Sequence, residues 1–170
     1  GFDFTPLDAS GTVIALTGSP AVPSATPRCV KDNVTNLIWE VKTTSGLQDT
    51  SYLYAWGNDA GAASCGASVS PCNTDAYIAA LNAADLCGET ADDWRLPTLR
   101  ELLGIVHNGM TTPPAIDANY FSATQSNWYW TNDTYQLYSG YALVVRFSNG
   151  ESGAVDKSGS NYVRLVRSGQ

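Results

Sequence analysis

The side chains best suited to chemistry lie together in residues 127–141, where aromatic rings alternate with amides, hydroxyls and a carboxylate. Tyr and Trp supply rigid contact area and Asn, Asp, Ser and Gly supply adaptable hydrogen bonds, the mixture found in antibody binding sites. Sugars are recognised by the same mixture. Period-two alternation predicts that Trp128 and Trp130 are buried and that Tyr129 faces outward. We therefore expect a binding site with these contacts: Tyr129, Asn132, Asp133, Tyr135, Gln136, Tyr138 and Tyr141.

Residue types that catalysis and metal binding require are scarce. His107 is the single histidine, and no nucleophile or second ligand stands at a recognisable spacing from it. The sequence has no Cys-x-x-Cys pair, no glycine-rich phosphate loop, no His-Glu-x-x-His and no convincing carboxylate dyad. We therefore expect no catalysis, no zinc and no cofactor. A structural calcium ion is compatible with the acidic balance.

Four cysteines, Cys29, Cys65, Cys72 and Cys87, indicate an oxidising compartment, because an even number in a Lys-poor chain rich in Gly, Ser and Asn is typical of disulfide-bonded proteins. Three pairings are possible. We favour Cys65–Cys72, which closes a short loop, and this leaves Cys29–Cys87 as a long-range link.

Charge narrows the choice of partners. The net charge is −7, only 15% of the residues are charged, and no run of Lys or Arg occurs. Nucleic acid, anionic membranes and strongly sulfated glycans need clustered cations and are disfavoured. No apolar run approaches the roughly 20 residues of a membrane span. The chain does not begin with Met, so we expect that an export signal or anchor preceding Gly1 was removed.

The elements that position these side chains fit one domain, since 170 residues suffice for one core. Residues 1–27 hold four of the eight prolines and are interpreted as an N-terminal arm and linker, and residues 28–170 as the domain. Two short strands are expected within residues 29–42. Thr74 is expected to cap a helix from Asp75 to Leu86.

A second helix is predicted from Leu99 to His107, because Thr98 and Glu101 match the capping box and Pro97 favours an extended entry. Arg95 is expected to bond backbone carbonyls or to pair with Asp92 or Asp93. We assign structural rather than ligand-binding roles to five residues: Trp39, Trp94, Arg95, Thr98 and Glu101.

The C-terminal third predicts an antiparallel meander. Residues 141–147 and 151–156 flank Ser148-Asn149-Gly150, a strong hairpin signal, and residues 162–167 alternate as a closing strand. The turn and residues 153–161 are expected to extend the binding surface. Two helices followed by such a meander give an α+β fold with a mostly antiparallel, twisted sheet.

Several motifs, in order, resemble one family. Residues 31–40 (KDNVTNLIWE) resemble its opening DNVTGLMWE, and residues 87–103 resemble its core CGYSDWRLPTxxEL. Trp128-Tyr129-Trp130-Thr131, residues 147–150 and residues 162–167 resemble its endings YWSS, FxxG and YVRxVR. The chain is identified as similar to the Lcl C-terminal domain family, a bacterial domain of unknown function, over about residues 28–168.

The resemblance implies a C-type-lectin-like fold and an exported or surface-attached bacterial protein. It implies an adhesin-like module that binds a glycan or a host, phage or bacterial surface protein. The proline-rich N-terminal arm and the expected upstream segment add the expectation of a place on a pilus or another appendage. Two alternatives are a pilin-like or capping subunit that self-assembles, and a variable ligand-binding protein diversified by a retroelement. Thr131-Asn132-Asp133 only half matches a calcium-dependent lectin signature, so sugar binding through calcium is disfavoured.

Overall fold

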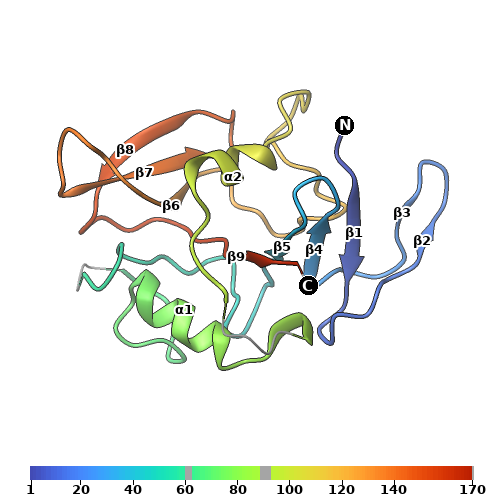
Figure 1. Cartoon of the computed structure of the whole chain (residues 1–170), viewed down its shortest axis with the longest axis horizontal. Helices are drawn as coiled ribbons and strands as arrows, with labels where there is room; N and C mark the ends of the chain where they lie inside the picture. Colours follow the sequence, from blue (N-terminus) through green and yellow to red (C-terminus); the bar gives the residue numbers. More distant parts are fainter. Residues whose placement is uncertain (60–62, 89–92, 170) are drawn as a thin grey trace.

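The computed structural model describes residues 1–59, 63–88 and 93–169, which form an α+β fold with antiparallel sheets (Figure 1). The main sheet has the order β1-β4-β5-β9, so strands from both ends of the chain lie in one sheet. The fold class predicted from the sequence is therefore confirmed at the level of α+β. The four strands of this sheet are β1 (Phe4–Leu7), β4 (Cys29–Asp32), β5 (Leu37–Glu40) and β9 (Val166–Ser168).

Residues 1–27 contribute a strand to the main sheet: β1 pairs with β4 from Phe4 opposite Asp32 to Leu7 opposite Cys29. Both Phe4 and Leu7 are buried in the core. A proline, Pro6, lies inside this strand. It is tolerated because β1 is the edge strand of its sheet.

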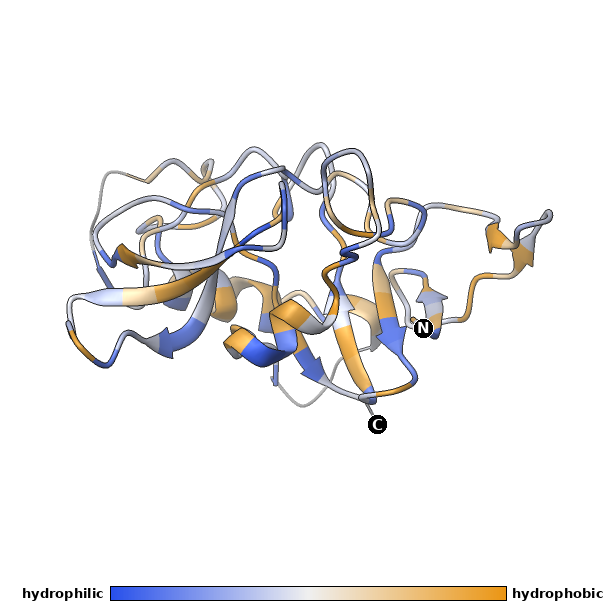
Figure 2. Cartoon of the chain, turned by 90° about the horizontal axis from the view of Figure 1, so that it is seen from above, coloured by the Kyte–Doolittle hydropathy of each residue, from blue (hydrophilic) through white to orange (hydrophobic). Residues whose placement is uncertain are grey.

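The remainder of the N-terminal segment projects from the body of the molecule as a hairpin of β2 (Leu16–Thr17) and β3 (Val22–Pro23) (Figures 1 and 2). Leu16 in this hairpin exposes an apolar side chain, as does Val13 in the segment that leads into it and forms a bridge with Leu7. Isolated two-stranded hairpins are marginally stable in water, so this is the part of the fold with the least internal support.

The second sheet consists of β6 (Trp128–Thr134), β7 (Tyr141–Arg146) and β8 (Ser152–Asp156) in that order. The Ser148–Gly150 turn joins β7 to β8, as its sequence predicts, and Gly150 adopts a φ of +78° that suits glycine. The closing strand is shorter than expected. Residues 162–165 cross from β6 to the main sheet, and only the three residues of β9 pair with β5 there.

Two hydrophobic clusters form the core, and β6 supplies side chains to both. Trp130 and Trp94 belong to the cluster that also contains residues of α1 (Thr74–Asn82). Tyr129 and Trp39 belong to the cluster beside α2 (Leu99–Gly104). The structural roles assigned to Trp39 and Trp94 agree with their burial. A strand that lies between two clusters is buried on both faces, so neither set of its alternating side chains points to solvent.

Helix α1 begins and ends earlier than the sequence pattern indicated. Asn73 is the cap residue, and its side-chain oxygen accepts the Ala76 N–H at 2.9 Å. Thr74, the expected cap, is the first helical residue, and its hydroxyl oxygen accepts the Gly57 N–H at 2.7 Å. The helix ends at Asn82, whose side-chain oxygen accepts the Trp94 N–H at 3.0 Å. A short 3₁₀ helix (Leu86–Gly88) follows.

The capping box of α2 is present, since the Thr98 hydroxyl accepts the Glu101 N–H and the Glu101 carboxylate accepts the Thr98 N–H at 2.7 Å. The helix ends at Gly104, short of the expected His107. Arg95 donates to the Leu96 carbonyl at 3.1 Å, as one of the two expectations had it, and its carboxylate partner is Glu101, through two contacts of 2.8 Å, rather than Asp93. The other expected partner, Asp92, lies outside the described residues. One carboxylate thus caps the helix and holds the arginine that precedes it.

Both expected disulfides are present: Cys29–Cys87, which links residues 58 positions apart, and Cys65–Cys72, which closes a loop over 7 positions. The long disulfide ties the second strand of the main sheet to the 3₁₀ helix. The short disulfide closes the loop that precedes α1.

A buried ionic cluster, which the sequence pattern did not reveal, joins β5 to α1. The Glu40 carboxylate accepts hydrogen bonds from Lys42 Nζ at 2.8 Å, from the Tyr77 hydroxyl and from the Leu165 N–H at 2.9 Å. Burial lowers the pKa of Lys42 and raises that of Tyr77. Because each member is hydrogen-bonded, removing one partner would leave a buried charge uncompensated.

Candidate functional site

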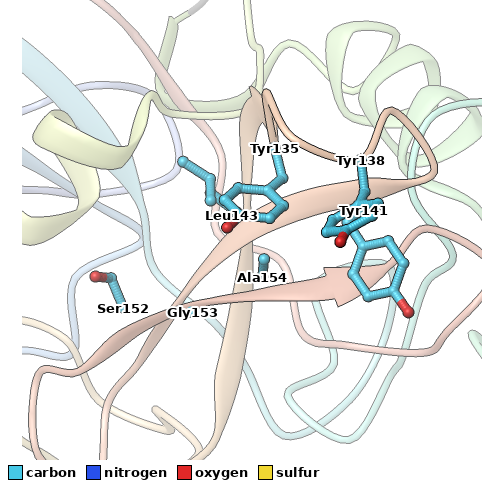
Figure 3. A pocket seen from close by; sticks show the side chains of 7 residues that line it. All are labelled: Tyr135, Tyr138, Tyr141, Leu143, Ser152, Gly153 and Ala154. Atoms are coloured by element: carbon cyan, nitrogen blue, oxygen red, sulfur yellow. The ribbon is translucent and has the colours of Figure 1, made fainter.

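Three tyrosines at the β6–β7 connection form a continuous aromatic wall. The ring centroids of Tyr135 and Tyr138 lie 6.1 Å apart, and those of Tyr138 and Tyr141 also lie 6.1 Å apart. Figure 3 shows the rings gathered at one end of a hollow, with Ser152 toward its other end. Tyr138 leaves 65% of its surface exposed, so the wall is open to solvent.

The alternation of β7 explains how this wall stands over an apolar floor. Ala142 and Val144 are fully buried in the core, and Leu143 lies between them on the opposite face of the strand. In the pairing of β7 with β8, Ala154 stands opposite Leu143 and therefore shares its face. The floor of the hollow is thus apolar where the tyrosine rings meet it.

The hollow has a volume of about 520 Å³, and no formally charged side chain lines it. We call it the tyrosine groove. Its lining residues are Tyr135, Tyr138, Tyr141, Leu143, Ser152, Gly153 and Ala154.

A second hollow of about 570 Å³ adjoins the tyrosine groove and runs toward α2, with Tyr135 and Leu143 shared between them. Asp133 and Gln136, two of the candidate contacts, line this second hollow. The pair of hollows gives an elongated surface along the open face of the second sheet rather than one round pocket. Its remaining lining residues are Thr98, Leu99, Arg100, Thr134 and Leu137.

Backbone hydrogen bonds, not side chains, hold the β6–β7 connection. The Tyr135 N–H donates to the Tyr141 carbonyl at 2.8 Å, and the Tyr141 N–H donates to the Tyr138 carbonyl at 2.9 Å. The Lys157 N–H donates to the Gly140 carbonyl at 2.9 Å and anchors the connection to the segment after β8. The rings of the wall are therefore available for contacts with a ligand.

Asp133 is engaged by the fold, because its Oδ2 accepts the Leu99 N–H at 2.5 Å at the start of α2. A carboxylate at this position satisfies one of the free N–H groups of a helix N-terminus. Asn132 is exposed, and its backbone N–H donates to the Pro97 carbonyl at 2.7 Å. Asn132 lines neither hollow. These two residues connect β6 to α2 and stiffen one side of the site.

The outward orientation predicted for Tyr129 is wrong. Its side chain is 1% exposed, and its ring packs edge-on against Phe147 with centroids 5.0 Å apart. The hydroxyl accepts the Gln125 N–H at 2.9 Å, and burial raises the pKa of Tyr129 to about 12. Trp128, expected to be buried, is half-buried beneath the Arg146 guanidinium. Tyr129 is buried because the first half of β6 lies between the two hydrophobic clusters.

The sequence reasoning missed the floor and rim of the site. Leu143 was assigned only to a strand, although its register opposite Ala154, which lies in the range expected to extend the binding surface, could have indicated a shared surface. Leu137 is an exposed large apolar side chain at the tip of the connection and lines the second hollow. A leucine in a polar loop was the signal that could have identified it.

Metal-binding groups do not converge in the part of the chain that the structure describes, where no three His, Cys, Asp or Glu side chains are placed to hold an ion.

Some of the acidic side chains and the histidine are engaged in local turns. Asp156 accepts the Ser158 N–H at 2.9 Å and the Ser158 hydroxyl at 2.7 Å, and these hydrogen bonds lower the pKa of Asp156. Asp49 and Ser51 form the same turn. His107 Nδ1 accepts a backbone N–H two residues later, at 3.1 Å.

Comparison with protein families identifies a match over most of the chain. The family model described as the Lcl C-terminal domain matches residues 28–167. No curated protein matches the chain, and no solved structure matches it. The matched range includes α1, α2, all four cysteines, and the strands β4 to β8 with most of β9. It leaves out β1, the β2–β3 hairpin and the last residue of β9. The chain therefore belongs to the Lcl C-terminal domain family.

Proposed function

We propose that this chain is an exported bacterial surface module, adhesin-like, that binds a glycan or a protein ligand through the tyrosine groove and is not an enzyme. The observation that carries the proposal is the aromatic wall of Tyr135, Tyr138 and Tyr141. These three rings belong to neither hydrophobic cluster of the core, yet they stand together over an apolar floor. Exposed aromatic clusters with a polar rim are typical of recognition surfaces.

An extracellular, cell-surface or periplasmic location is supported by the two disulfides, since such bonds persist in oxidising compartments. Among the described residues, no helix has the length and apolar character needed to cross a membrane. Placement on a pilus or another appendage is part of the same proposal.

The test is binding of the purified chain to a glycan array and to a panel of immobilised surface proteins, with and without a chelator. The test variant carries Tyr135→Ala and Tyr138→Ala. The control variant is Val34→Ala, which removes a side chain that is 72% exposed in the turn between β4 and β5. We expect selective binding that the control keeps, the tyrosine variant loses and the chelator leaves unchanged.

Equal binding by the tyrosine variant would refute the groove as the site. Loss of binding in chelator would refute the metal-independent mode and point to a cation that bridges protein and ligand. Circular dichroism of all three proteins shows whether each remains folded, so that a loss of binding is not confused with a loss of structure.

We also propose that the fold is C-type-lectin-like. The proposal is supported by the strands from the two ends of the chain that share one sheet, by the second antiparallel sheet beyond it, and by the two helices. An experimental structure superposed on C-type-lectin-like domains tests it. A different connectivity between the two sheets would exclude that fold.

A structural role as a self-assembling subunit is the second candidate, because Leu16 in the β2–β3 hairpin and Val13 in the segment that leads into it expose apolar side chains. Light scattering coupled to size exclusion tests it over a wide range of concentrations. Self-association that Val13→Ser with Leu16→Ser abolishes would favour assembly, and a monomer at every concentration would exclude it.

A further inference from the structure

We propose that Asn108 is a site of spontaneous deamidation, in which the backbone nitrogen of Gly109 is the nucleophile and the His107 imidazole is the internal base. These residues line neither the tyrosine groove nor the second hollow, so the inference is independent of the proposed function. It is carried by the geometry of residues 107–110 and by a comparison with the other Asn-Gly pair of the chain, Asn149-Gly150.

Deamidation requires a backbone nitrogen that can attack the side chain of the preceding asparagine. The nitrogen of Gly109 forms a bond to Cγ of Asn108, and the proton of this N–H passes through a base to the amide nitrogen, which leaves as ammonia. Water then opens the cyclic succinimide at either carbonyl and gives aspartate or isoaspartate. Glycine favours the attack because it has no Cβ to shield its nitrogen.

The imidazole of His107 is placed to take that proton. The Gly109 N–H donates to His107 Nδ1 at 3.1 Å, which is within the reach expected between a general base and the proton it removes. A nitrogen that accepts this hydrogen bond carries no proton, because a neutral imidazole has one donor and one acceptor. Phe2 packs beside the imidazole, with ring centroids 5.3 Å apart. The base therefore stands at the N–H before the reaction starts.

The turn itself holds the base and the nucleophile together. The Met110 N–H donates to the His107 carbonyl at 3.1 Å and closes the four-residue turn. A Cβ at position 109 would lie 2.9 Å from His107 Cε1, so the imidazole can approach this closely because the residue is glycine. Such proximity makes the proton transfer an intramolecular step.

The electrophilic side chain is free to reach the nucleophile. Asn108 is exposed, and in the described part of the chain its side chain has no hydrogen-bond partner. Rotation of its amide toward the Gly109 nitrogen therefore breaks no hydrogen bond of the fold.

The second Asn-Gly pair has the same residue types but different surroundings. The Gly150 N–H donates to the Arg146 carbonyl at 2.8 Å, and a carbonyl oxygen is not a base that can remove the proton. Asn149 Oδ1 accepts the Glu151 N–H at 3.2 Å, which restrains the side chain. Asn149 is also exposed, so access to water is available at both pairs. The chain thus contains its own control.

The experiment incubates the purified full chain at neutral pH in water enriched in heavy oxygen and follows both asparagines by peptide mapping and mass spectrometry. The proteins are the wild type, His107→Phe, which keeps a ring but removes the base, and Val34→Ala as a surface control. We expect Asn108 to deamidate at least about tenfold faster than Asn149 in the wild type. His107→Phe should remove most of this difference and leave the rate at Asn149 unchanged.

The same measurement in concentrated urea separates the fold from the local sequence. We expect the two rates to converge there, because the turn that holds His107 against Gly109 is lost. A difference that persists in urea would assign the effect to neighbouring residues in the sequence and refute the role of the folded turn.

Two further outcomes would overturn the inference. Equal rates at Asn108 and Asn149 in the folded protein would refute Asn108 as a preferred site. Undiminished deamidation of Asn108 in His107→Phe would refute the imidazole as the base. Circular dichroism establishes that each variant is folded. Ligand binding at the tyrosine groove is measured separately, so a failure here leaves the proposed function standing.

Discussion

Tyr129 and Tyr138 are the same residue type in one short segment, yet the structure predicts opposite responses to truncation. Tyr129 is 1% exposed and its ring packs on Phe147 and Tyr162 with centroids 5.0 and 5.5 Å away. Tyr129→Ala should therefore reduce the free energy of unfolding by about 3–5 kcal/mol, as for other large aromatic truncations in cores. Tyr138 is 65% exposed and holds no core contact, so Tyr138→Ala should change it by less than about 0.5 kcal/mol.

The hydroxyl of Tyr129 can be separated from its ring. Tyr129→Phe keeps the packing but leaves the Gln125 N–H without this acceptor, which should cost about 1 kcal/mol. Burial raises the pKa of Tyr129 from 10.0 to about 12. The stabilisation from this difference is fully present below pH 10 and is lost as the pH rises through 12, because the unfolded chain ionises first. Tyr129→Phe should therefore weaken the alkaline loss of stability.

The assay is urea-induced unfolding at neutral pH, followed by tryptophan fluorescence and by circular dichroism, for all three variants and the wild type. Coincident transitions by the two probes justify a two-state analysis. Equal destabilisation by Tyr129→Ala and Tyr138→Ala would refute the assignment of one ring to the core and the other to the binding surface. A stable Tyr129→Ala variant would show that this face of β6 is open to solvent after all.

Two further predictions concern the supports of the fold. Replacing both cysteines of the Cys29–Cys87 disulfide by alanine should cost about 4 kcal/mol in the chain-entropy description, against about 2 kcal/mol for Cys65–Cys72, because the two bonds span 58 and 7 positions. Urea titration of both double variants checks the order, and equal losses would contradict it. Hydrogen bonds from its arginine partner lower the pKa of Glu101 from 4.5, so its contribution to stability is present above that pH and is lost as the pH falls. The stability difference between wild type and Glu101→Gln should therefore be large near neutral pH and shrink at about pH 3, as measured by thermal unfolding at both values.

Features that depend on local sequence could be predicted. The α2 capping box follows from Thr98 and Glu101 because the two hydrogen bonds close within three residues. The β7–β8 hairpin follows from the conformational freedom of Gly150. The cysteine pairing was also predicted, because the short loop over Cys65–Cys72 left a single alternative for the other two.

Features that depend on which distant surfaces pack together could not be predicted from the local sequence. Alternation along β6 placed Tyr129 outside, but a second cluster covers that face at the start of the strand. Arg95 was expected to bond backbone carbonyls or to pair with a nearby aspartate. It does donate to the Leu96 carbonyl, but its carboxylate partner is Glu101, which the helix that follows brings within reach. Of the candidate contacts, the three wall tyrosines line one groove because the connection folds back to the start of β7 at Tyr141, which no local pattern predicts.

The placement of the long disulfide beside the first strand has a mechanical consequence. A pull applied at Gly1 and resisted at the tyrosine groove would load the four residue pairs between β1 and β4. Once β1 has separated, the tension reaches Cys29 and passes through sulfur to Cys87, so the chain between these two cysteines cannot lengthen. The slack released by the N-terminal segment would be at most about 100 Å at roughly 3.5 Å per residue. The elements between the two cysteines, β4, β5 and α1, would stay folded under load, because the disulfide carries the tension past them.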